Sequence, residues 1–209
     1  MERWVRIASW VVPPVLMGGV YMVFAATSDA DNTGKAWMAI GFGFVLVIWL
    51  VFRILVEQTA LARAVASGDA ERLLRVTARR TDPAALAYRA LAHELRGDWP
   101  AALAAATQAK PHGNPPFEVL AAAVRVSALV ETGDVAAARR VADEALEPAV
   151  TRLDTRLHPA PNHHAMLARA RLLAAEGQRD AADRELQRVM DDIRAGEAIR
   201  ARARALKAR

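Results

Sequence analysis

Three of the five histidines, His158, His163 and His164, fall within the segment HPAPNHH and are the first candidates for metal chemistry. Zinc ligands occur at turn or helical spacing and need a fourth partner. Here the adjacent histidines point in different directions and prolines surround them. We therefore expect an irregular loop between repeats rather than a metal site. The absence of cysteine excludes disulfides, iron–sulfur ligation and thiolate zinc sites, and no cofactor is expected.

The sequence contains no familiar catalytic motif: GxSxG, the P-loop, GxGxxG after a strand and HExxH are all missing. The adjacent acids Asp191-Asp192 and Asp143-Glu144 face apart on a helix, so solvated helix surface explains them better than a shared substrate. We expect a protein that is not an enzyme, because an enzyme would need a pocket assembled from scattered residues.

Three arginines, Arg89, Arg125 and Arg169, each fall midway along a predicted helix. If they share a face, they form a ladder that binds the carboxylates of a partner. The alternative is that they are ordinary surface residues among 25 arginines. These three are the candidate partner-binding residues.

The formal net charge of +5 is concentrated at the C-terminus. Residues 57–198 contain 19 basic and 20 acidic side chains, whereas the last eleven residues contain five basic side chains and no acid. A neutral body argues against nucleic acid as the partner. Residues 197–209 are expected to form a basic helical tail with Ala203 exposed. The tail either lies on anionic lipid headgroups or is a solvated, frayed helix end.

Residues 1–56 are almost continuously apolar and predict a membrane anchor with two transmembrane helices, at about 7–26 and 36–56. At 1.5 Å per residue, each reaches roughly the 30 Å thickness of a bilayer core. The alternative for the first stretch is a cleaved signal peptide, but it is long for that role and Pro13-Pro14 interrupts it. Neither stretch carries an Asp, Glu or His, which favours an anchor over an ion path.

The distribution of arginine predicts the orientation of this anchor. Basic residues precede the first span and follow the second, whereas the connecting segment, residues 27–35, holds two aspartates and one lysine. The positive-inside rule therefore places both termini in the cytoplasm. We expect a multi-pass protein of the inner (plasma) membrane of a bacterium.

After residue 56 the sequence repeats one unit: an apolar-faced helix, a glycine turn, an aspartate and an alanine-rich helix. The copies cover 85–109, 121–146 and 164–190, with a degenerate copy at 61–80. Glycine ends the first helix in a left-handed conformation, and the aspartate caps the next helix. Small residues at Ala102, Ala138 and Ala182 allow the paired helices to pack closely. The pattern predicts an all-α protein whose hairpins must stack.

These features resemble the tetratricopeptide repeat (TPR) family. The similarity lies in the turn Gly97-Asp98-Trp99, in the alanine five residues after three of the turn glycines (Ala102, Ala138 and Ala182), and in a later alanine at Ala109 and Ala145. The turn glycines are 29, 36 and 44 residues apart rather than the family's 34, and Arg89, Arg125 and Arg169 replace a large family residue. The resemblance covers residues 57–196 and implies an α-solenoid of three to four helix pairs that binds proteins.

The layout is also similar to that of the HemY-type inner-membrane proteins, which have two spans followed by helical hairpins. We expect a membrane-anchored scaffold, adaptor or accessory subunit that binds a protein partner at the membrane face. The alternative is a component of a transport or secretion assembly whose transmembrane helices take part directly. Because residues 44–67 lack glycine and proline, the second span is predicted to continue as one helix into the repeats.

Overall fold

The computed structural model describes residues 18, 41, 43–49, 51, 64, 65, 67–109 and 113–208. The chain divides into two compact units, Met1–Ala60 and Leu61–Arg209. The described residues of both units are helical or lie in turns and loops, and no strand occurs among them. The predicted all-α class is confirmed for this part of the chain.

In the first unit, residues 43–49 and 51 are helical and expose large apolar side chains, namely Phe44, Val45, Val47, Ile48 and Val51. Within the described residues, no helix is both long and apolar enough to cross a bilayer. The spans predicted at 7–26 and 36–56 lie largely outside these residues. The same holds for the junction of the helix predicted to continue from 44 to 67.

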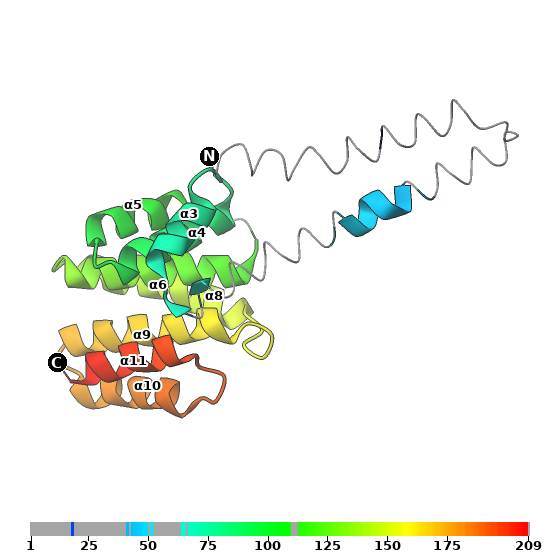
Figure 1. The fold of residues 1–209 in the computed structure, drawn as a ribbon. Coiled ribbons are helices and arrows are strands. Elements are labelled where there is room, and N and C mark those ends of the chain that lie inside the picture. The colour runs from blue at the N-terminus through cyan, green and yellow to red at the C-terminus, as the bar shows by residue number, and fades with distance from the viewer. Residues whose placement is uncertain are drawn as a thin grey trace, which may run out of the picture. The chain divides into compact units, whose positions relative to one another are not determined.

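Three helix hairpins form most of the second unit (Figure 1). They are α4 (Pro83–Leu95) with α5 (Trp99–Gln108), α6 (Pro115–Glu131) with α7 (Val135–Val141), and α9 (Pro159–Ala175) with α10 (Arg179–Asp191). Before them lies α3 (Ala70–Thr77), and after them α11 (Glu197–Lys207). The hairpins coincide with the three clear repeat copies in the sequence.

The turns within these hairpins have the conformation that their glycines predict. Gly97, Gly133 and Gly177 have φ values of +72°, +89° and +80°. A Cβ atom is disfavoured in this left-handed region, so glycine ends each first helix at low cost.

Aspartate caps begin two of the three second helices, as predicted. The Oδ1 atoms of Asp98 and Asp134 accept hydrogen bonds from the backbone N–H three residues later, at 3.3 and 2.9 Å. In the third hairpin the prediction is wrong: Gln178 is at the N-cap and makes no side-chain hydrogen bond there. Asp180 lies in the first turn of α10 instead, where its charge favours the helix N-terminus.

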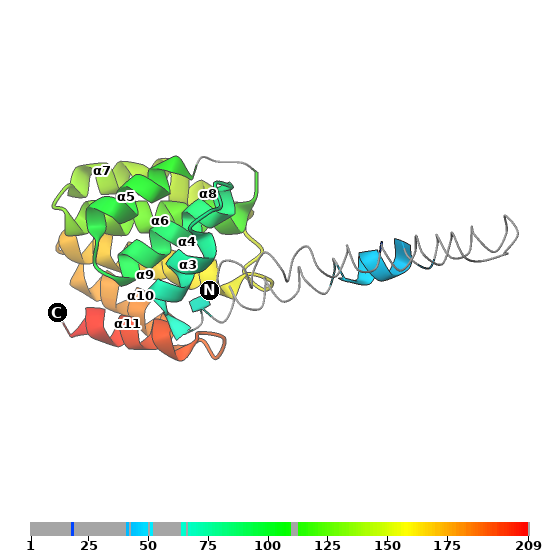
Figure 2. The same cartoon turned by 45° about the horizontal axis from the view of Figure 1, so that its top comes forward.

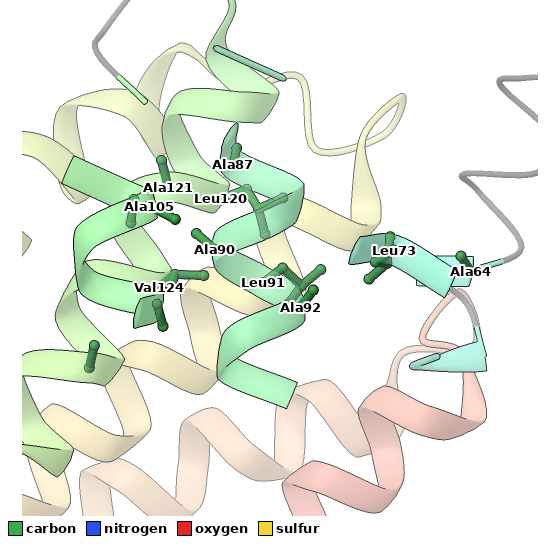
Figure 3. Close-up of a cluster of buried hydrophobic side chains, with 13 residues drawn as sticks. Ala64, Leu73, Ala87, Ala90, Leu91, Ala92, Ala105, Leu120, Ala121 and Val124 are labelled. Carbon is green, nitrogen blue, oxygen red and sulfur yellow. The ribbon is translucent and has the colours of Figure 1, made fainter. Parts of the chain in front are cut away.

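Alanine fills the space between the paired helices. Ala102, Ala138 and Ala182 are all buried, as their position in the repeat predicts. In the first hydrophobic cluster, Ala90 and Ala105 lie among α4, α5 and α6 (Figure 3). Small side chains let the helix backbones approach closely, so a larger residue at these positions would meet a neighbouring helix.

Successive hairpins stack in chain order, from α4 and α5 to α10 and α11 (Figures 1 and 2). The two longest described helices, α6 and α9, pack against each other in the middle of the stack. Three clusters of buried apolar residues follow one another: one around α4 to α6, one between α6 and α9, and one among α9, α10 and α11.

The helix after Gly133 is longer than the repeat copy predicts. It runs through α7, a π-helical turn at Ala142–Leu146 (η1) and α8 (Glu147–Arg152). Pro148 lacks the N–H that would bond to the carbonyl of Glu144, which accounts for the change of hydrogen-bond pattern just before it.

Two further expectations are wrong. HPAPNHH is not an irregular loop, because α9 begins at Pro159. Proline is tolerated in the first turn of a helix, where its missing N–H would have had no partner. The second concerns the C-terminal segment, which is helical as expected: in α11, Ile199 and Ala203 belong to the third cluster, and Ala203, expected to be exposed, is fully buried.

Candidate functional site

A buried ionic cluster joins helices that are far apart in the sequence. Glu94, in the last turn of α4, accepts hydrogen bonds from Arg171 of α9 at 2.6 Å and from Arg202 of α11 at 2.5 Å. The side chains of Glu94 and Arg171 are only 3% and 9% exposed. The cluster therefore connects the first hairpin directly to the third hairpin and to α11.

Helix α6 also takes part in this ionic cluster. The Oγ atom of Ser127 accepts a hydrogen bond from Nη1 of Arg171 at 2.8 Å, and Oε1 of Glu131 lies 3.5 Å from Nε of the same arginine. Arg171 thus faces two carboxylates and a hydroxyl. Such additional partners are what a buried charge needs to offset its loss of hydration.

The ionic cluster perturbs the titration of its members. Burial alone would raise the pKa of Glu94, but the positive charges of Arg202 and Arg171 outweigh it and lower that pKa to about 2. His164, on α9, is buried beside the same charges. Its burial, followed by repulsion from Arg202, lowers the pKa of His164 to about 3. At neutral pH the glutamate is therefore charged and the histidine neutral.

A pocket of about 340 Å³ opens beside the ionic cluster. Its lining combines charged residues with Trp99 and with apolar residues of α4 and α11. The lining residues are Glu94, Leu95, Arg96, Gly97, Trp99, Arg171, Arg202, Ala205 and Leu206. The Cζ atom of Arg171 lies 5.5 Å from the centre of the Trp99 ring, a cation–π distance. Guanidinium groups next to an aromatic and an aliphatic surface suit a peptide segment that carries a carboxylate.

Arg202 has spare capacity for hydrogen bonding next to this pocket. Its Nη2 atom binds Glu94, whereas its Nη1 atom is buried and has no hydrogen-bond partner in the described part of the chain. Arginine has five N–H donors, so the guanidinium of Arg202 keeps hydrogen-bonding capacity that the described residues do not use.

The three arginines predicted to bind a partner are placed on three different helices. Arg89 donates to the carbonyl oxygens of Thr77, at 2.5 Å, and Arg80, at 2.8 Å, and so closes the end of α3. Arg169 forms a two-pronged ion pair with Glu147. Arg125 is half-buried. No contact among the described residues joins two of these arginines, and the arginine ladder remains a prediction.

One of the candidate histidines, His163, pairs with one of the adjacent acids, Asp192. Nε2 of His163 lies 2.9 Å from Oδ2 of Asp192, which makes Asp192 part of a contact between α9 and the end of α10 rather than free surface. Hydrogen bonds from Arg194 and from His163 lower the pKa of Asp192. Within the described residues, no group of three or more His, Asp and Glu side chains is arranged to hold a metal ion.

Sequence reasoning did not single out Glu94, Arg171 or Arg202. A signal was present for two of them. Glu94 follows Ala87, Ala90 and Leu91 at helical spacing and so falls on the apolar face of α4. Arg171 interrupts the apolar face of α9 in the same way. A charged residue within an apolar stripe indicates a buried pair, but the sequence does not say with which helix.

Comparison of the chain with protein-family models, with curated proteins and with solved structures found no match. The geometry of the site is a buried glutamate held by two arginines next to a pocket with an aromatic wall.

Proposed function

We propose that this chain is a membrane-anchored scaffold or adaptor of the inner (plasma) membrane, whose helical hairpins bind a protein partner at the membrane face. One observation carries this proposal: the stacked hairpins present a pocket that combines Trp99, Arg171 and Arg202. It offers binding groups of both polar and apolar character. The repeats at 57–196 serve as a TPR-like solenoid, and both termini are cytoplasmic.

The anchor consists of two transmembrane helices at about 7–26 and 36–56. Support comes from the apolar composition of residues 1–56 and from the helical residues 43–49 and 51. Five large apolar side chains in this short stretch are exposed, which is costly in water and favourable in lipid.

The partner segment is expected to carry a carboxylate next to an apolar side chain. The carboxylate would face Arg202, and the apolar group would contact Trp99 and Leu206. A charged centre surrounded by apolar walls is the usual arrangement of an energetically important contact in a protein interface. The ionic cluster beneath the pocket holds both arginines in place before binding, which lowers the entropy cost of association.

The test is quantitative co-purification of the tagged full chain from membranes in mild detergent. The Ala205→Trp variant fills the pocket from an exposed position of α11 without removing a charge. The matched control is Ala201→Trp, which is also exposed on α11 and does not line the pocket. We expect one protein to be recovered with the wild type and with the control, and to be lost with Ala205→Trp. Equal recovery with both variants would reject the pocket as the binding site.

A further inference from the structure

Two large apolar side chains of the second unit are strongly exposed. Leu157 is 73% exposed and Ile193 is 90% exposed. The other exposed large apolar residues in the described part of the chain all lie between 44 and 51, in the first unit. Scattered apolar surface residues are ordinary, but these two lie on loops that contact each other.

The two loops lie at the same end of helices α9 to α11, at the side away from the labelled C-terminus (Figure 1). One loop connects α8 to α9 and the other connects α10 to α11. The Nη1 atom of Arg194 donates to the carbonyl oxygen of Thr155 at 3.3 Å and so joins the loops. The pair between His163 and Asp192 ties the helix ends behind them.

Both loops are held so that their apolar tips point away from the core. Oδ1 of Asp154 accepts from the backbone N–H groups of Arg156 and Leu157, at 2.9 and 3.4 Å. Oδ1 of Asp192 accepts from the backbone N–H of Arg194 at 2.9 Å. Such aspartate turns fix the backbone of both loops, and they therefore hold Leu157 and Ile193 in exposed positions.

Helix α3 of the second unit begins at this same end. A Cβ atom placed on Gly68 would lie 3.4 Å from the Cβ of Ala198, which is in the first turn of α11 directly after the Ile193 loop. The second predicted span ends at residue 56, so only eleven residues, 57–67, separate it from Gly68. A fully extended chain of that length reaches about 40 Å. A bilayer that holds the anchor is therefore within reach of these loops.

We propose that Leu157 and Ile193 form a bilayer-docking edge, whose two apolar tips enter the headgroup region of the membrane that holds the anchor. This inference rests on the membrane anchorage in the proposed function. Moving two such side chains from water into the membrane interface is favourable, because the free energy gained is proportional to the apolar surface that is buried. The side chain of Arg156, exposed next to Leu157, has no partner among the described residues and is free to bind anionic headgroups. Docking would fix the orientation of the hairpins and leave the pocket beside Arg171, near the other end of α9, facing the cytoplasm.

The absence of cysteine makes a direct test possible. Leu157→Cys, Ile193→Cys and the control Gln178→Cys each introduce one thiol at an exposed position for a fluorescent label. Gln178 is in the turn between α9 and α10, at the opposite end of these helices. The labelled full chain is reconstituted in vesicles of phosphatidylcholine and phosphatidylglycerol. It is then exposed to iodide, which quenches from water, and to spin-labelled lipid, which quenches from the membrane.

We expect spin-labelled lipid to quench the labels at 157 and 193 while iodide does not, and the label at 178 to behave in the opposite way. Iodide quenching of all three labels, with none from the lipid, would overturn the docking edge and leave a protein partner as the occupant of these tips. Failure of the anchor has a different result: the chain would then be removed from the vesicles by alkaline carbonate. Retention after carbonate together with water-exposed labels would reject only the docking edge.

Discussion

Contacts within the hairpins differ from the contact that joins α4 to α9 and α11. Within a hairpin, alanines such as Ala102 and Ala138 pack between helices that are neighbours in the sequence. The second contact is ionic: Glu94 meets Arg171 and Arg202, which lie 77 and 108 residues further along the chain. Small apolar residues set the distance between neighbouring helices. The ionic contact holds α4, in the first hairpin, against α9 and α11, because an ion pair requires specific partners.

Substitution in the ionic contact should lower the free energy of unfolding more than substitution in a hairpin interface. Replacing Glu94 by Gln keeps the shape of the side chain but leaves Arg171, 9% exposed, and Arg202, 19% exposed, without their shared carboxylate. Removing one partner of a buried ion pair costs about 3–5 kcal/mol of the free energy of unfolding. Urea unfolding of the full chain in detergent, followed by circular dichroism, measures this loss.

The matched control for this variant is Glu71→Gln. Glu71 is exposed, and its carboxylate lies 3.6 Å from a guanidinium nitrogen of Arg96. Exposed pairs contribute at most about 1 kcal/mol, so the control should change the stability little. Equal losses for Glu94→Gln and Glu71→Gln would show that the ionic cluster does not hold the stack together.

Substitutions in the hairpin interfaces should lower the stability by a smaller amount. Leucine at Ala102 or Ala138 would overpack a helix interface, at a cost of about 1–3 kcal/mol. Leucine at Ala203 should cost a similar amount, because this residue is fully buried against α10. The controls Ala136→Leu and Ala201→Leu lie on exposed faces of α7 and α11 and should be nearly neutral. Limited proteolysis compares the five variants, and equal protection of buried and exposed positions would contradict the helix pairing.

Acid should weaken the ionic contact before it affects the hairpins. Unfolded histidine titrates near 6.5, whereas the folded pKa of His164 is about 3. Between these values the unfolded chain binds a proton that the folded chain does not, so stability falls as the pH falls. Glu94 adds to this effect below its unfolded pKa of 4.5, down to about 2. Each group contributes a slope of up to about 1.4 kcal/mol per pH unit.

The His164→Asn variant separates the two contributions. Between pH 6.5 and 4.5 the stability of the wild type should decrease through His164, and this decrease should be smaller in the variant. Thermal unfolding of both chains across this range provides the measurement. An unchanged slope in the variant would mean that His164 is not held neutral by its burial beside Arg202.

The hairpins were predictable from the sequence because their determinants are local. A turn glycine, an aspartate and an alanine five residues later act within one helix pair, so their spacing locates the pair. The predicted aspartate cap is absent from the third hairpin, where Gln178 takes the N-cap position. The start of α9 was missed because proline and histidine suggest a loop, although Pro159 fits the first turn of a helix.

The candidate site was not predictable in the same way. Glu94 and Arg171 stand out within apolar helix faces, but their pairing depends on how α4 comes to lie near α9. The local sequence of α11 did not indicate that this helix packs against the hairpins, because its basic composition suggested a solvated helix. Its burial depends on Ile199 and Ala203, two apolar residues at helical spacing among four basic ones in 199–208.

The central claim is that the pocket beside Arg202 is where a protein partner binds at the membrane. Photo-crosslinking in intact membranes tests it most directly, with a photoreactive amino acid placed at Ala205 of the pocket and, as a control, at Ala136 on the exposed face of α7. We predict one discrete crosslinked protein from position 205 and none of the same size from position 136. No adduct from position 205, or the same pattern from both positions, would contradict the claim.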